Sequence, residues 1–111
     1  MTSIERVHGF WRALWRSHRI KGVRHVASIS DVPRQLGSKL YIVGVPKPKW
    51  AVLACPCRCG ERINVNLMSS RQPFWTLSGN DDALTLRPSL WMPEAKCGSH
   101  FFVRDSKIEW V

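Results

Sequence analysis

Three of the four cysteines of this 111-residue chain lie within five residues, in the segment Cys55-Pro-Cys57-Arg-Cys59-Gly60. The fourth cysteine and a histidine follow later, in Cys97-Gly-Ser-His100. A tetrahedral Zn²⁺ ion takes thiolate and imidazole ligands, and a tight turn together with a second short loop can surround it. The predicted ligands of a zinc ion are therefore Cys55, Cys57, Cys59, Cys97 and His100.

Five candidate ligands compete for the four positions of a tetrahedral ion. Either one cysteine is spare, or the metal has three protein ligands and an open position, as catalytic zinc sites do. A structural ion would instead tie the segment from Cys55 to Cys59 to the distant loop that holds Cys97, as metals often do in small domains. The spacing alone favours the structural site.

Three polar residues near these motifs are candidates for hydrolytic chemistry: Ser89, Ser99 and Glu61. A serine nucleophile needs a base within hydrogen-bond reach, but Ser99 and His100 are adjacent and point to opposite faces if they lie in one strand. A His100 that binds zinc cannot also act as a free base. Glu61 is either a general base for a zinc-bound water or an exposed residue at a strand edge.

Short β-branched and aromatic runs, separated by turn residues, predict the elements that position these side chains. The spacing indicates about seven short strands in a mainly β, mostly antiparallel domain. The expected strands are 39–43, 50–54, 63–67, 74–77, 84–86, 101–103 and 108–111, with hairpin turns at 78–82 and 105–106. We therefore expect a small antiparallel β domain that is tied together by zinc.

The first 25 residues carry more than half of the excess positive charge, +5 of a formal net charge of +9. Apolar residues recur there at three- and four-residue intervals between residues 4 and 18, which predicts a basic amphipathic helix. Such a helix docks on a membrane surface, a nucleic acid or an acidic protein, or it packs Trp11 and Trp15 on its own domain. A linker or short irregular segment is expected at 21–34. The predicted division is a basic N-terminal helix and linker, 1–34, and a zinc-binding β domain, 35–111.

The sequence also predicts a cytoplasmic protein. It contains no run of roughly 18 to 20 apolar residues, the length of a membrane span. Arginines interrupt what would have to be the apolar region of a signal peptide. In the reducing cytoplasm, four cysteines are expected to be metal ligands or reactive thiols rather than disulfides.

Six short motifs follow one another in the second part of the chain, at 40–44, 55–60, 73–77, 86–90, 97–101 and 108–110. As an ordered set they resemble a small bacterial family of formerly unknown function. Its members are encoded in operons with ubiquitin-like proteins and with E1-like and E2-like enzymes. The resemblance covers residues 35–111. Arg58 stands where that family often has glycine, so we expect a slightly different turn between Cys57 and Cys59.

The resemblance implies a zinc-containing peptidase in a bacterial ubiquitination-like pathway associated with phage defence. Its role would be to mature a ubiquitin-like precursor or to remove the ubiquitin-like protein from targets. Ser89 and Ser99 match the family's Pro-Ser and Ser-His motifs, and the five metal candidates match its ligand positions. The alternative is a non-enzymatic structural zinc module that binds a pathway partner or, through its positive charge, nucleic acid.

Overall fold

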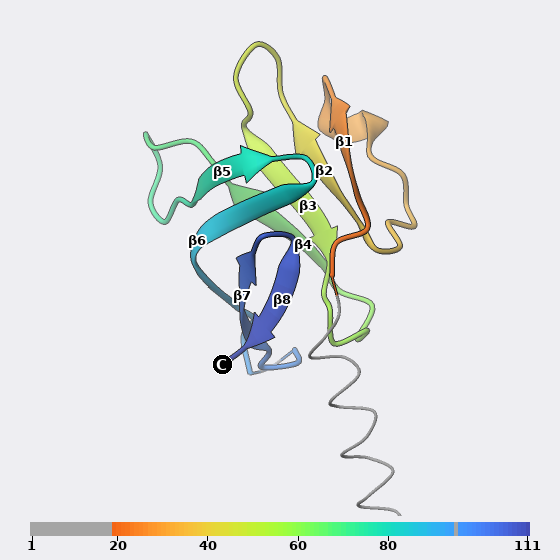
Figure 1. Cartoon of the computed structure of the whole chain (residues 1–111), viewed down its shortest axis with the longest axis vertical. Coiled ribbons are helices and arrows are strands. Elements are labelled where there is room, and N and C mark those ends of the chain that lie inside the picture. Colours follow the sequence, from red (N-terminus) through yellow and green to blue (C-terminus); the bar gives the residue numbers. More distant parts are fainter. Residues whose placement is uncertain (1–18, 95) are drawn as a thin grey trace, which may run out of the picture.

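The chain folds into two four-stranded sheets, seen in a computed structural model that describes residues 19–94 and 96–111 (Figure 1). The first sheet has the order β1 (Gly22–Val26), β2 (Lys39–Val43), β3 (Trp50–Ala54) and β4 (Arg62–Asn66). The second has the order β5 (Thr76–Asn80), β6 (Ala83–Trp91), β7 (His100–Arg104) and β8 (Lys107–Trp110). In the described part of the chain, the only helical element is a single 3-10 turn, η1 (Ile29–Asp31). The prediction of a mainly β chain is confirmed.

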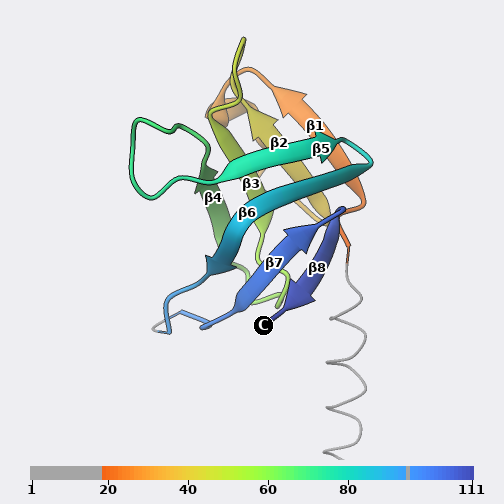
Figure 2. The same ribbon diagram turned by 60° about the vertical axis from the view of Figure 1, so that its left-hand side comes forward.

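The main core lies between the two sheets, which pack face to face (Figure 2). Alternation along each strand sends every second side chain inward. In β4, for example, Ile63 and Val65 are buried while Asn64 between them is exposed. Phe101 of β7 is fully buried and belongs to the same cluster as Leu40 of β2.

The outer faces of the two sheets differ in what covers them. A second apolar cluster covers the first sheet, where Val32 and Leu36 from the loop before β2 pack with Tyr41, Val43 and Val52. This double burial explains why β2 and β3 are almost continuously apolar. The outer face of the second sheet stays partly open and carries the residues described below.

The segment at 21–34, expected as a linker, contains β1 and η1 instead. Strand β1 pairs in parallel with β2, whereas the remaining strand pairs are antiparallel. It was missed because only Val23 is buried, so β1 shows no apolar alternation. The described part therefore has eight strands rather than seven. The division after residue 34 stays a prediction, and the predicted helix at 4–18 lies outside the described residues.

The hairpin between β5 and β6 is tighter than the expected loop at 78–82. Asn80 Oδ1 accepts hydrogen bonds from the backbone amides of Asp82 and Ala83, which closes the turn directly after β5. Gly79 has a φ of +88°, and a Cβ there would lie 2.1 Å from the Ala83 carbonyl oxygen, so only glycine fits. Strand β6 then extends beyond the expected 84–86 and includes Ser89.

Within the described residues, we find no helix with the length and apolar character needed to cross a membrane.

Candidate functional site

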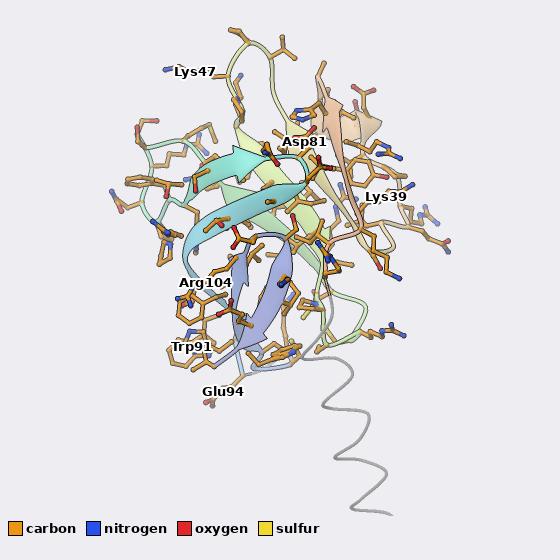
Figure 3. All side chains as sticks on the ribbon, viewed as in Figure 1. Lys39, Lys47, Asp81, Trp91, Glu94 and Arg104 are labelled. Carbon is orange, nitrogen blue, oxygen red and sulfur yellow. The ribbon has the colours of Figure 1, made fainter. Side chains whose placement is uncertain are left out.

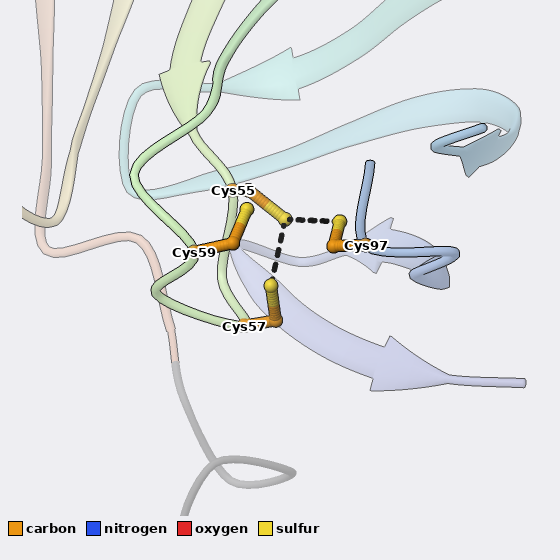
Figure 4. Close-up of side chains that lie close together, drawn as sticks. All are labelled: Cys55, Cys57, Cys59 and Cys97. Atoms are coloured by element: carbon orange, nitrogen blue, oxygen red, sulfur yellow. Dashed lines mark hydrogen bonds between the residues drawn. The ribbon is translucent and has the colours of Figure 1, made fainter. Parts of the chain in front are cut away.

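The four cysteine sulfurs come together at one end of the two sheets (Figure 4). Cys55 follows β3, Cys57 and Cys59 lie in the turn before β4, and Cys97 lies in the loop between β6 and β7. All four sulfur atoms lie within 4.8 Å of one another. Cys55 Sγ is 3.4 Å from Cys57 Sγ and 3.7 Å from Cys97 Sγ, and none of the four thiols forms a disulfide.

The separations between these sulfurs suit one shared metal ion. Four thiolates arranged tetrahedrally around Zn²⁺ at about 2.3 Å have sulfurs roughly 3.8 Å apart. The sulfur–sulfur distances of 3.4 and 3.7 Å are close to that value. Four protein ligands would fill the tetrahedron and leave no open position, which is the arrangement of structural sites. His100, the fifth predicted ligand, is not part of this group.

The turn that carries three of the cysteines is fixed by its backbone. The Cys55 amide donates to the Glu61 carbonyl oxygen at 2.9 Å, and the Arg58 amide donates to the Cys55 carbonyl oxygen at 3.0 Å. Arg58 has a φ of +66° and Gly60 a φ of +90°. Arg58 thus adopts the left-handed conformation that glycine takes without a steric cost.

The thiols differ in their readiness to ionise. Burial raises the pKa of the Cys55 thiol. The Ser99 hydroxyl donates a hydrogen bond that lowers the pKa of the Cys97 thiol to about 7. Because the thiolate is the form that binds a metal, this hydroxyl supports Cys97 as a ligand.

Ser99 and Glu61, two of the three predicted catalytic residues, therefore lie at the cysteine cluster. Ser99 is buried. The Glu61 carboxylate forms an ion pair with Lys96 Nζ at 3.1 Å, which joins the two loops that carry the cysteines. In the part of the chain that the structure describes, neither residue has a hydrogen bond to His100.

Ser89, the third predicted catalytic residue, meets His100 on the outer face of the second sheet. Ser89 Oγ lies 2.8 Å from His100 Nε2, and both residues are half-buried. Alternation along β6 and β7 places these two side chains and that of Trp91 on the same face. The three residues between Leu86 and Leu90 oppose a single residue of β7, so β6 bulges where it carries Ser89.

Neighbouring groups hold the Ser89–His100 pair in place. The Trp91 indole stacks on the His100 imidazole with ring centroids 4.5 Å apart and planes 1° from parallel. Trp75 Nε1 donates to the Ser89 carbonyl oxygen at 3.2 Å, and the Val111 amide donates to the His100 carbonyl oxygen at 3.0 Å. Across residues 19–94 and 96–111, no carboxylate is hydrogen-bonded to His100.

Trp91 could not be singled out from the sequence, because an exposed tryptophan at a strand end has no distinguishing spacing. Trp91 is 66% exposed, and its side chain projects from the same side of the molecule as Arg104 (Figure 3). A serine hydroxyl bonded to an imidazole is the arrangement that allows nucleophilic attack on a carbonyl carbon. The molecule thus separates a set of metal-binding thiols from a serine–histidine pair.

Comparison with protein families gives a match over most of the chain. A family model described as "Bacterial ubiquitination-like system serine protease (BubE)" matches residues 28–111, about three quarters of the chain. No curated protein and no solved structure matches. The matched region includes the four cysteines, Ser89 and His100.

Proposed function

This chain belongs to the family of bacterial ubiquitination-like system serine proteases, and from that premise we propose Ser89 as its nucleophile and His100 as its general base. The observation that supports the pair is the 2.8 Å contact between Ser89 Oγ and His100 Nε2. The substrate we propose is a ubiquitin-like protein, cleaved at its C-terminus to mature the precursor or to release it from a target.

In the proposed reaction, Ser89 Oγ attacks the carbonyl carbon of the scissile amide while His100 Nε2 takes the hydroxyl proton. The tetrahedral intermediate collapses, His100 gives that proton to the leaving amine, and the acyl group remains as an ester on Ser89. A water then attacks the ester with His100 again as base. Ester cleavage releases the carboxylate product and returns the proton to Ser89 Oγ.

Trp91 takes the place of an orienting third residue in this proposal. The near-parallel stack fixes the plane of the imidazole, so that Nε2 keeps facing Ser89. An aromatic face also attracts a cation, which favours the imidazolium formed after proton transfer. The second effect is stronger in the transition state, where the imidazolium forms, than in the resting enzyme.

We propose that Cys55, Cys57, Cys59 and Cys97 hold a zinc ion whose role is structural. When bound, the ion would cross-link the turn before β4 to the loop before β7. That loop leads directly into His100, so the cross-link supports the position of the base. Because the four sulfurs leave no open position, the proposed chemistry belongs to the outer face of the second sheet.

We further propose that the peptidase works in the cytoplasm, alongside E1-like and E2-like enzymes, in a pathway of phage defence. The non-enzymatic alternative, a zinc module that binds a partner protein or nucleic acid, has the positive charge of the chain in its favour.

The direct test is to incubate the purified, metal-loaded chain with a ubiquitin-like protein that carries a C-terminal extension. We expect cleavage at the junction by the wild-type chain and none by His100→Ala. A folded, metal-loaded wild-type chain that cleaves no member of a panel of such fusions would contradict the proposed function. Salt-sensitive binding of nucleic acid by the same preparation would then favour the non-enzymatic alternative.

A further inference from the structure

An open groove of about 490 Å³ lies directly beside the Ser89–His100 pair. Its lining residues come from the segment before β5 and from β5, β6 and β7: Phe74, Thr76, Arg87, Pro88, Phe102 and Arg104. The volume falls in the range of about 300 to 1,000 Å³ that is usual for ligand sites.

The groove borders the proposed catalytic pair through neighbours of Ser89 and His100 that line it. Pro88 immediately precedes Ser89 in β6. Phe102 lies two residues after His100 on the same face of β7, and the two ring centroids are 6.4 Å apart. This adjacency lets a chain whose scissile bond lies at Ser89 Oγ place a neighbouring residue over the groove.

The two arginines of the groove are not equivalent. The Arg104 guanidinium lies 4.3 Å from the centroid of the Phe102 ring and forms an ion pair with Glu109 at 2.9 Å. Arg87 is exposed, and its guanidinium has no ion pair or hydrogen bond with any residue that the structure describes. The groove thus contains one neutralised cation and one guanidinium with its donors unused.

We propose that this groove is a substrate subsite in which Arg87 binds the carboxylate of an acidic side chain close to the scissile bond. The inference rests on the proposed function. A guanidinium presents paired donors that match both oxygens of a carboxylate. The rings of Phe74, Pro88 and Phe102 pack against the aliphatic part of that residue and of its neighbour. The occupant is therefore an acidic segment of the substrate chain.

The test uses the full, metal-loaded chain and ubiquitin-like fusions that differ only in the three residues on either side of the junction. Each position is Glu, Gln or Lys in turn. For one position we expect Glu to give a kcat/KM about fivefold above Gln, mainly through KM, which is the size of effect that an exposed ion pair produces. The preference should shrink as salt is raised.

Charge variants identify the residue responsible. Arg87→Gln should abolish the preference for Glu, and Arg87→Glu should reverse it in favour of Lys. Arg34→Glu, an equal change of charge at an exposed position in the loop before β2, should leave the preference unchanged. Binding of the uncleaved Glu and Gln fusions to Ser89→Ala should show the same ratio without turnover.

The experiment distinguishes a failure of the proposed subsite from a failure of the proposed function. If the wild-type chain cleaves Glu, Gln and Lys fusions equally at every position, or if Arg87→Glu keeps the preference for Glu, the subsite is wrong while the peptidase stands. If the wild-type chain cleaves none of the fusions, the proposed function fails first.

Discussion

The peptide bond between Ser99 and His100 links the surroundings of the cysteine cluster to the Ser89–His100 pair. Ser99 supports the Cys97 thiol, whereas the next residue, His100, bonds to Ser89 on the outer face of the second sheet. Ser99 directly precedes β7 and His100 is the first residue of that strand, so one step along the chain separates the metal region from the proposed catalytic region. Residues that are neighbours in sequence therefore belong to different sites.

The largest expected effect is on the catalytic side of this division. Ser89→Ala should lower kcat about a thousandfold or more, because no other hydroxyl is bonded to His100 among the described residues. The metal content of the variant should equal that of the wild type, measured by atomic emission on the same preparation. Cleavage that persists in Ser89→Ala would show that the reaction does not take place at the Ser89–His100 pair.

Ser99→Ala is the matched change on the metal side. Loss of a hydrogen bond to a metal ligand typically weakens metal affinity by about 10- to 100-fold. The fully loaded variant should cleave within about twofold of the wild type. Competition with a chelator gives the affinity, and cleavage at saturating zinc gives the rate. A large loss of kcat in the loaded variant would instead place Ser99 in the chemistry.

The dependence of metal affinity on pH also tests whether Ser99 supports the Cys97 thiolate. The pKa of Cys97 is lowered to about 7 by the Ser99 hydroxyl, so a proton competes with the metal at this thiol as the pH falls through that value. We expect zinc affinity to decrease from pH 8 to pH 6. In Ser99→Ala this decrease should begin at higher pH. Identical profiles for the two proteins would show that Ser99 does not support the thiolate.

Trp91→Leu should have an intermediate effect on catalysis. Without the stacked indole the imidazole is free to turn, so we expect kcat to fall about tenfold while KM changes little. Trp91→Phe keeps an aromatic face and should recover most of the rate. Steady-state kinetics of the three proteins decides the matter. Equal losses in the two variants would show that stacking does not position His100.

The smallest effect concerns the turn of the cysteine cluster. Arg58 adopts a left-handed backbone that costs a non-glycine residue about 1 kcal/mol. A glycine at this position would avoid that cost, but the greater freedom of glycine in the unfolded chain offsets part of the stabilisation. Arg58→Gly should therefore raise the free energy of unfolding by up to about 1 kcal/mol, measured from urea midpoints. Arg62→Gly in β4, the control, should lower it.

The sequence predicts a site well where its residues lie close together in the chain. It predicts a site less well where strand pairing brings distant residues together. Cys55, Cys57 and Cys59 fall within five residues, so their proximity could be predicted from spacing alone. The contact between Ser89 and His100 depends on the register of β6 against β7 and on the bulge between Leu86 and Leu90. No short motif encodes that register. The expectation that Ser99 and His100 face apart as adjacent residues of one strand stays a prediction, because β7 begins at His100.

Strand β1 shows a second limit of sequence patterns. It pairs with β2 through backbone hydrogen bonds while most of its side chains stay outside the core, so its residues carry little apolar signal. The metal-binding potential of the cysteines and the mainly β class could both be predicted from the sequence. The stacking of Trp91 on His100 was not, because it is a contact between two strands.

The assignment of Ser89 as a nucleophile activated by His100 is tested most directly with a serine-directed fluorophosphonate. The metal-loaded chain is allowed to react with it, and the labelled residue is located by peptide mapping. We expect one label, on Ser89, that is absent from His100→Ala and retained in Ser99→Ala. Labelling of Ser99, or a Ser89 that reacts equally well without His100, would contradict the assignment of the serine–histidine pair.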